Sequence, residues 1–372
     1  MDCIEKRKRR KRRRKRSNSY RERVKRAITN RRHRRVKKSR IIRTRRTRFL
    51  QTLPDIQRRI AIEFPGYVQL VAPKHFSLVE NETKTIEFLS KLKKQYELKH
   101  KVFIVLDYVQ SLSIDAILVL LSNMVNFKNA NIDFNGDRPI DSVARYKLET
   151  SGFFDHLYVK DKFRNEYSFK KMNSHIYTHG QKTVASSSAD ELIKYASEIV
   201  WGEPRRCPGA QKTMVELMHN TYDHADENKG GKHWWISVEH DQDNKEVTFS
   251  FIDFGVGIFR SIENKKEGDP LFGLKEHFAQ FFPFAKTQVE KLRLMLEGKV
   301  RLTQTNEYFR GKGLSKIYNH NLENKISSLV IISNYAYANV ENQDFHSLDK
   351  EFVGTFISWK INKDTYSLKW EI

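Results

Sequence analysis

The first fifty residues set the strongest limit on what this chain can fold into. They contain 26 Lys and Arg against three acidic residues, so they carry +23 of the formal net charge of +24, which leaves +1 for residues 51–372. Such a segment has too few apolar side chains to offset the entropy cost of folding, and its charges repel one another. We therefore expect a disordered Lys/Arg-rich arm at 1–50 and a nearly neutral folded body after it.

The composition of the arm indicates what it binds. Its only aromatic residues are Tyr20 and Phe49, so stacking on bases is not expected. Polyvalent contact with the phosphates of RNA or DNA is the favoured interpretation. An anionic membrane surface is an alternative, although the arm lacks interleaved apolar anchors. A third alternative is that the arm only solubilises or directs the protein.

Several features favour a cytoplasmic protein without a membrane span, associated with the nucleoid or RNA through its arm. Two cysteines, Cys3 and Cys207, are too few for a disulfide framework. The most apolar stretch begins at Ser111 and contains Asp115, and it is shorter than the roughly 18–20 apolar residues that span a bilayer. The N-terminus lacks the apolar segment of a secretory signal.

The folded body is predicted to be α/β and to contain two domains. Residues 51–65 form a connector with a short helix at 56–64, and residues 161–188 form a polar linker. Between them, short apolar runs alternate with amphipathic segments, as in a sheet covered by helices. The expected strands are 67–72, 102–107 and 132–134; the expected helices are 83–98, 113–126 and 141–151; residues 153–159 close the domain.

This order, with VFIVLDYVQSLSIDAILVLL at its strand, loop and helix, resembles the STAS family, the small anti-sigma-antagonist fold, over residues 66–160. The resemblance implies a small α/β domain that binds a partner or dimerises. The family's phosphoacceptor serine is expected just after Asp115, where this chain has Ala116. Phosphorylation there is therefore not expected, and Ser111 and Ser113 are interpreted as loop or cap residues.

Four short motifs in the second half of the sequence contain polar and glycine residues that are candidates for a binding site. The first is ELMHNTYDHA at 216–225, in a predicted helix. Glu216, Asn220 and Asp223 share one helical face, and their oxygen atoms suit Mg²⁺. A solvated helix face is the alternative interpretation. Ser188, with Glu191 three positions later, is predicted to cap the N-terminus of a helix that comes before this one in the sequence.

The second motif follows a predicted hairpin of strands 233–240 and 246–252 and contains Asp253, Gly255 and Gly257. An Asp at a strand end can accept a hydrogen bond from an exocyclic amine, and glycines let the backbone approach a ligand. Taken alone, this pattern is more typical of a turn.

The third motif is Gly311, Lys312, Gly313 and Leu314, ahead of a predicted helix at 315–319. Backbone N–H groups at a helix N-terminus, with a lysine nearby, bind phosphate oxygens well. The fourth is Gly354 and Thr355, expected to open a final strand after the strand at 329–334.

In this order, the four motifs resemble the GHKL superfamily, the ATP-binding fold of gyrase, the ninety-kilodalton heat-shock chaperone and histidine kinases, over residues 189–372. The resemblance implies a C-terminal two-layer α/β sandwich, the Bergerat fold, that binds ATP and Mg²⁺. It implies that Asn220 holds Mg²⁺, that Asp253 reads the adenine amine with support from Thr355, and that Glu216 is the general base. The other implied nucleotide-site residues are Asp223, Gly255, Gly257, Gly311, Lys312, Gly313 and Leu314.

The resemblance leaves three functions open. The favoured one is an ATP-hydrolysing conformational switch tethered to nucleic acid; the alternatives are a serine/threonine protein kinase resembling the anti-sigma kinases and a non-hydrolysing ATP sensor. A histidine autokinase is disfavoured because His175 and His179 lack the usual acidic neighbour. Residues 258–310 stand where the family has a lid. Its Phe278, Phe281, Phe282 and Phe284 are interpreted as core, although a protein partner or a second copy could bind through the lid or the STAS-like domain.

Overall fold

The computed structural model describes residues 54–158, 176–179, 186–224, 234–241, 243–253, 255–263, 283–299 and 313–366. Its contacts divide the chain into two compact units, 1–66 and 67–372. Helix α2 (Asp55–Glu63) is the described part of the first unit and confirms the predicted short helix. The predicted disordered arm lies outside the described residues. No helix in the described ranges is long and apolar enough to cross a membrane.

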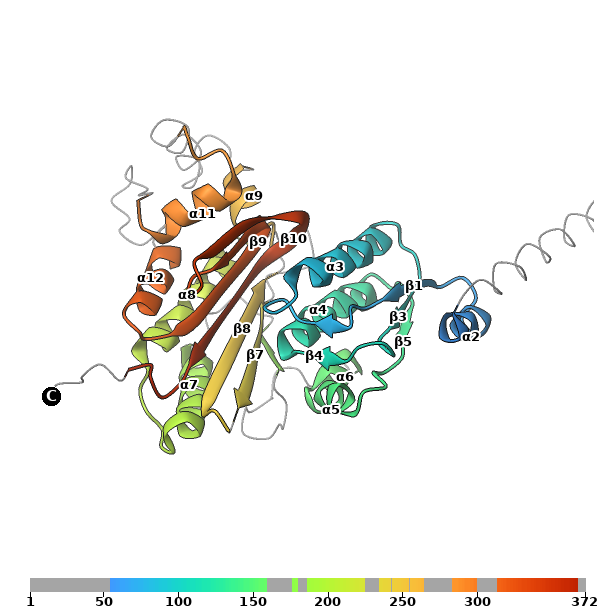
Figure 1. Ribbon diagram of the computed structural model, residues 1–372, viewed down its shortest axis with the longest axis horizontal. Helices are drawn as coiled ribbons and strands as arrows, with labels where there is room; N and C mark the ends of the chain where they lie inside the picture. Colours follow the sequence, from blue (N-terminus) through green and yellow to red (C-terminus); the bar gives the residue numbers. More distant parts are fainter. Residues whose placement is uncertain are drawn as a thin grey trace, which may run out of the picture. The chain divides into compact units, whose positions relative to one another are not determined.

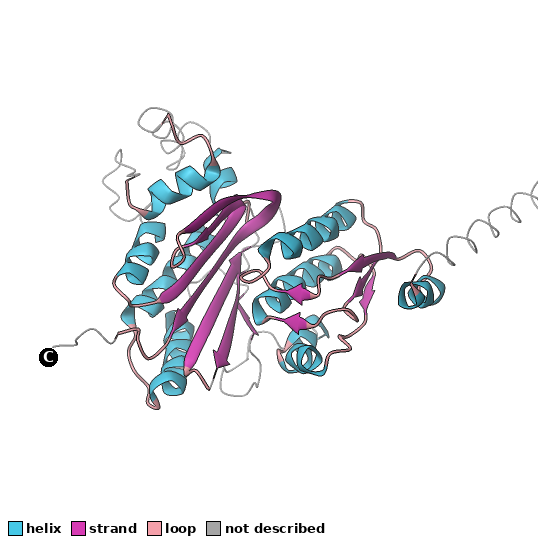
Figure 2. Cartoon of the chain, in the orientation of Figure 1, coloured by secondary structure: helices cyan, strands magenta, loops and turns pink. Residues whose placement is uncertain are grey.

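The unit 67–372 has a mixed α/β fold, as predicted (Figure 2). Its first half contains a parallel sheet in the order β1-β3-β5 and a parallel two-stranded sheet of β2 and β4. The strands are β1 (Val68–Val71), β2 (His75–Phe76), β3 (Val102–Val105), β4 (Ser111–Leu112) and β5 (Phe134–Gly136). The helices are α3 (Glu82–Glu97), α4 (Ile114–Asn129), α5 (Ser142–Thr150) and α6 (Phe153–Tyr158).

Most predicted elements of this half are confirmed within a few residues. The strand predicted at 132–134 begins only at Phe134, and the closing segment is a helix, α6. Sequence patterns missed the pair of β2 and β4, because two-residue strands are too short to show an alternation of apolar and polar side chains.

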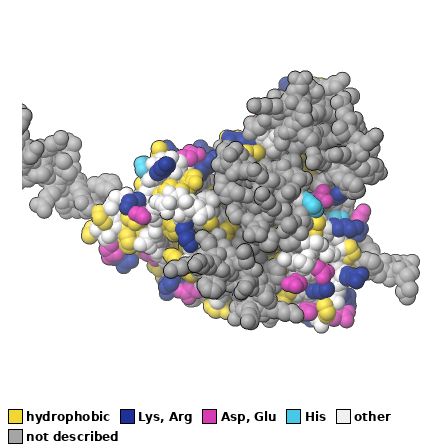
Figure 3. Space-filling model, turned by 180° about the vertical axis from the view of Figure 1, so that it is seen from behind, with side chains coloured by type: hydrophobic (Ala, Val, Ile, Leu, Met, Phe, Trp, Pro, Cys, Tyr) yellow, Lys and Arg dark blue, Asp and Glu magenta, His cyan; other side chains and the backbone are white. Residues whose placement is uncertain are grey.

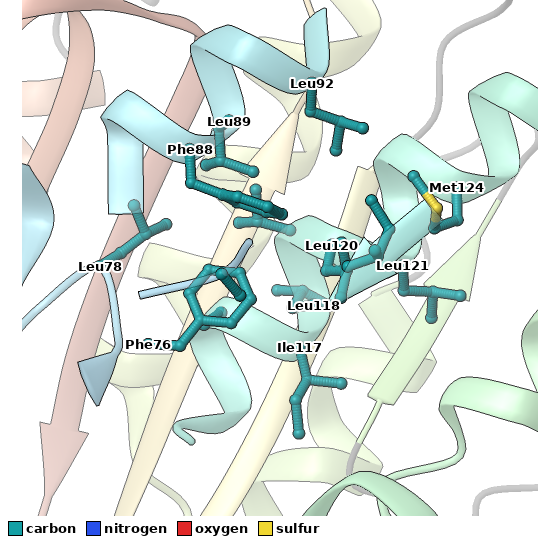
Figure 4. Close-up of a cluster of buried hydrophobic side chains, with 14 of the residues drawn as sticks. Phe76, Leu78, Phe88, Leu89, Leu92, Ile117, Leu118, Leu120, Leu121 and Met124 are labelled. Atoms are coloured by element: carbon teal, nitrogen blue, oxygen red, sulfur yellow. The ribbon is translucent and has the colours of Figure 1, made fainter. Parts of the chain in front are cut away.

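Helix α4 explains the most apolar stretch of the sequence. It begins after Ser113, whose hydroxyl accepts a hydrogen bond from the N–H of Ala116, which is the cap role expected for this serine. Twelve of its sixteen residues are buried, and a helix that is apolar all round must be covered on every side. Figure 4 shows its side chains packed against residues of β2, of α3 and of the loop between them; the labelled residues are Phe76, Leu78, Phe88, Leu89, Leu92, Ile117, Leu118, Leu120, Leu121 and Met124.

The second half is built on a five-stranded antiparallel sheet in the order β6-β7-β8-β10-β9. The strands are β6 (Ile176–His179), β7 (Trp234–Asp241), β8 (Glu246–Asp253), β9 (Ser327–Asn339) and β10 (Asp344–Ile361). The helices are α7 (Ser186–Trp201), α8 (Pro208–His224), α9 (Ile258–Glu263), α11 (Gln288–Leu296) and α12 (Gly313–Leu322).

Three local predictions for this half need correction. Ser188 lies inside α7, which begins at Ser186, so it does not cap the helix. Gly354 and Thr355 lie within β10 and do not open it, because β10 extends the hairpin with β9 back to Asp344. The predicted linker at 161–188 includes β6, a strand paired with β7.

The five-stranded sheet is buried on both faces (Figure 1). One face, with Phe251 and Trp359, shares a core with α7, α8, α11 and α12. The other, with Trp235, Ile252 and Phe356, joins the core built on α3 and α4. Strands buried on both faces are nearly continuous apolar runs, as in VTFSFI of β8. The surfaces of α3 and α4 that meet the sheet are therefore not available to another protein. The predicted boundary between two domains stays a prediction.

Candidate functional site

A row of polar side chains ends the apolar core at one end of the five-stranded sheet. Asp253 of β8 pairs with Thr355 of β10, which pairs with Ser333 of β9. Alternate residues of a strand point to the same face, and Phe251, Ile357 and Ile331, two positions along each strand, pack in the core shared with α8. The three polar side chains therefore face the helical layer.

The carboxylate of Asp253 is held from two sides. The N–H of Gly255 donates to Asp253 Oδ1 at 2.9 Å, and Thr355 adds hydrogen bonds from its side chain and backbone. Burial raises the pKa of Asp253 to about 6, while these hydrogen bonds act in the opposite direction. A carboxylate fixed in this way is a directed hydrogen-bond acceptor.

Local geometry requires a glycine at Gly257 and favours one at Gly255. Gly257 has φ of +81°, a conformation that residues with a Cβ rarely adopt. A Cβ on it would lie 2.5 Å from Asn334 Oδ1, and a Cβ on Gly255 would lie 3.0 Å from Asp253 Oδ1. These glycines allow the chain to turn tightly around the carboxylate and then enter α9.

A second cluster joins two motifs that lie far apart in the sequence. Gly313, the first residue of α12, sits against the face of α8 that carries Glu216 and Asn220. A Cβ on Gly313 would lie 3.0 Å from Glu216 Oε1 and 3.3 Å from Asn220 Nδ2. The fold thus places a carboxylate and a carboxamide directly beside the N-terminus of a ten-residue helix.

Glu216 has a cationic partner that sequence reasoning missed. Lys316 Nζ lies 3.3 Å from Glu216 Oε2 and 3.5 Å from Oε1. Lys316 follows Gly313 by three positions, so it stands one turn along α12 on the same side. The helical spacing from the predicted glycine motif could have revealed it.

The remaining predicted residues are only partly described. Leu314 of α12 is half-buried against the core of the helical layer. The side chain of Asp223 and all of Gly311 and Lys312 lie outside the described residues. Of the four predicted lid phenylalanines, only Phe284 is described, and it is 64% exposed, contrary to its interpretation as core. In the described ranges, no three or more His, Cys, Asp and Glu side chains gather as a metal cluster.

The described surface carries mixed charge. On the face seen in Figure 3, Lys and Arg side chains are interspersed with Asp and Glu over the described residues. This agrees with the formal charge of +1 for residues 51–372. The excess positive charge of the protein belongs to its first fifty residues.

No protein-family model matches the sequence, and no curated protein is similar enough to be matched.

Proposed function

We propose that residues 189–372 form a GHKL-type ATP-binding sandwich, preceded by a STAS-like domain, and that the protein is an ATP-hydrolysing conformational switch. The observation that carries this proposal is the contact of Gly313 with Glu216 and Asn220. The order of these motifs in the sequence suggests a single nucleotide site. The contact supports this suggestion, because it brings residues of two of the motifs together in space. The pairing of Asp253 with Thr355 is a second point of support.

The side chains fit Mg-ATP. Asp253 offers an acceptor for the adenine amine, and the side-chain oxygen of Asn220 is a ligand of the type that Mg²⁺ prefers. Bound Mg²⁺ would neutralise charge on the phosphates. Glu216 would orient the attacking water and accept its proton. Lys316 Nζ, 3.3 Å from Glu216 Oε2, would help to hold this carboxylate in position.

The basic arm gives the switch an attachment point. With +23 of net charge in residues 1–50, it would bind RNA or DNA through phosphate contacts, in the cytoplasm and independently of sequence. ATP-driven changes in the lid or the STAS-like domain would then act on a protein partner or a second copy held near the nucleic acid.

The test separates binding from chemistry on one helix. Asn220→Ala should abolish Mg²⁺-dependent ATP binding measured by calorimetry. Glu216→Ala should still bind ATP, while turnover falls on the order of a hundredfold or more. His219→Ala is the matched control, because His219 is exposed on the same helix. Wild-type turnover by Glu216→Ala would remove Glu216 from the mechanism.

The fate of γ-labelled ATP distinguishes the alternatives. Release of free phosphate supports the switch. Label on a protein of the cell extract supports the kinase alternative, and binding of ATP without turnover supports the sensor. If the full-length wild type binds no ATP in the presence of Mg²⁺, all three functions fail together.

A further inference from the structure

Asn334 of β9 is a buried polar residue that no sequence motif singled out. It is 1% exposed and adopts φ of +51°, a left-handed conformation that Asn tolerates better than most residues. The carboxamide lies against the loop that follows Asp253.

The carboxamide binds the loop on both of its polar ends. Nδ2 donates to the carbonyl oxygen of Val256 at 2.9 Å, and Oδ1 accepts from the N–H groups of Phe259 at 3.0 Å and Arg260 at 3.4 Å. The neighbouring Ser333 hydroxyl accepts from the N–H of Ile258 at 2.9 Å. These contacts satisfy the first backbone donors of α9, which have no partners within the helix.

Glu351 of β10 fixes the orientation of the carboxamide. Its Oε1 accepts from Asn334 Nδ2 at 3.3 Å. The same carboxylate binds Arg260 of α9, with Nε at 2.6 Å and Nη2 at 2.8 Å. A carboxylate beside Nδ2 requires a donor at that position, so the amide nitrogen must point to Glu351 and the amide oxygen to the loop.

We propose that Asn334 is a positioning residue of the nucleotide site, which fixes the turn 255–257 and the start of α9 beside Asp253 and thereby sets the discrimination between adenine and guanine. The proposal rests on the proposed function. Asp253 can select an amine over a carbonyl oxygen only if its carboxylate stays in one place, because hydrogen bonds weaken steeply with distance and angle. Ser333 links the same loop to the partner of Asp253, since its hydroxyl donates to the carbonyl of Gly354 and lies 3.5 Å from Thr355 Oγ1.

The test removes the carboxamide while keeping the backbone. Asn334→Gly suits the left-handed conformation, so loss of the side chain is not confounded by strain. In the full-length protein we expect ATP affinity to fall on the order of tenfold and the preference for ATP over GTP to narrow. Asn131→Gly is the matched control, because Asn131 is also left-handed, at φ of +54°, but is exposed.

A charge-rescue pair tests the geometry itself. Asn334→Asp keeps an acceptor for the loop but places two carboxylates about 3.3 Å apart, beside Glu351, so it should also weaken ATP binding. Adding Glu351→Gln restores a donor between the two side chains but restores neither the donor to the Val256 carbonyl nor the ion pair with Arg260, so it should recover part of the lost affinity. A merely structural role for Asn334 predicts no such recovery of selectivity for ATP over GTP.

Hydrogen exchange without nucleotide provides an independent readout. The amides of Phe259 and Arg260 should exchange faster in Asn334→Gly than in the wild type. If the wild type binds ATP and Asn334→Gly binds with equal affinity and selectivity, the proposal is refuted while the proposed function stands. If the wild type binds no ATP, the proposed function fails and the role of Asn334 falls with it.

Discussion

The carboxylate of Asp115, at the start of α4, gives the sharpest prediction for stability. It is 6% exposed. It accepts hydrogen bonds from the N–H of Leu78 at 3.1 Å, from Ser77 Oγ at 3.3 Å and from the Ser113 hydroxyl. Burial raises its pKa to about 6, these hydrogen bonds act in the opposite direction, and the nearby carboxylate of Glu239 raises it further.

The direction in which stability changes with pH follows from the number of protons bound in the folded and the unfolded state. Between about pH 4 and pH 6, the folded state holds the proton of Asp115 while the unfolded state has lost it, so stability falls as the pH rises through this window. A pKa raised from 3.8 to about 6 corresponds to ~3 kcal/mol at ~1.4 kcal/mol per pKa unit. The Asp115→Asn variant has no carboxyl group at this position, so its stability should not show this fall between about pH 4 and pH 6.

The assay is urea unfolding followed by tryptophan fluorescence at several pH values between about 4 and 7. The free energy of unfolding of Asp115→Asn, relative to wild type, should rise by most of this amount, ~2 kcal/mol, over this range. Comparing pH values cancels the changes in hydrogen bonding that the substitution itself brings. Asp133→Asn is the control, because the Asp133 side chain is 58% exposed. A difference that is the same at every pH would refute the argument.

Other predictions concern the nucleotide site and the arm. Gly313→Ala places a methyl group 3.0 Å from Glu216 Oε1 and displaces this carboxylate, so turnover should fall, whereas the exposed Asn319→Ala on the same helix should not change it. Asp253→Asn replaces an acceptor oxygen with a donor, so calorimetry should show reduced preference for ATP over GTP; equal wild-type binding of the two would disprove the adenine assignment. Deleting residues 1–48 should remove most nucleic-acid affinity and leave ATP binding intact. The affinity of the full chain should fall about a thousandfold between ~50 and ~200 mM salt if it contacts about six phosphates, and a flat salt dependence would reject the phosphate model.

Sequence patterns predicted the elements whose signal is local. Helix α3 and strands β7 and β8 follow from the spacing of apolar residues within each segment, and Asp253 is recognisable because it ends an apolar strand ahead of two glycines. Ser188 misled the prediction because a Ser run offers several possible helix starts, and α7 begins at the first of them, Ser186.

Residues that act through distant partners could not be predicted. Asn334 and Glu351 meet the loop after Asp253 only because β9 and β10 pair beside β8. In the sequence, Asn334 looks like the end of a strand at 329–334, which is where the prediction stopped. The contact of Gly313 with Glu216 likewise depends on how α12 packs on α8, which no local pattern encodes.

Because the five-stranded sheet is buried on both faces, fragments of this protein should differ in solubility from the full chain. A fragment that starts near Lys160 would keep the candidate nucleotide site but expose the sheet face that carries Trp235, Ile252 and Phe356. Large exposed apolar patches promote aggregation. We expect such a fragment to accumulate as insoluble material.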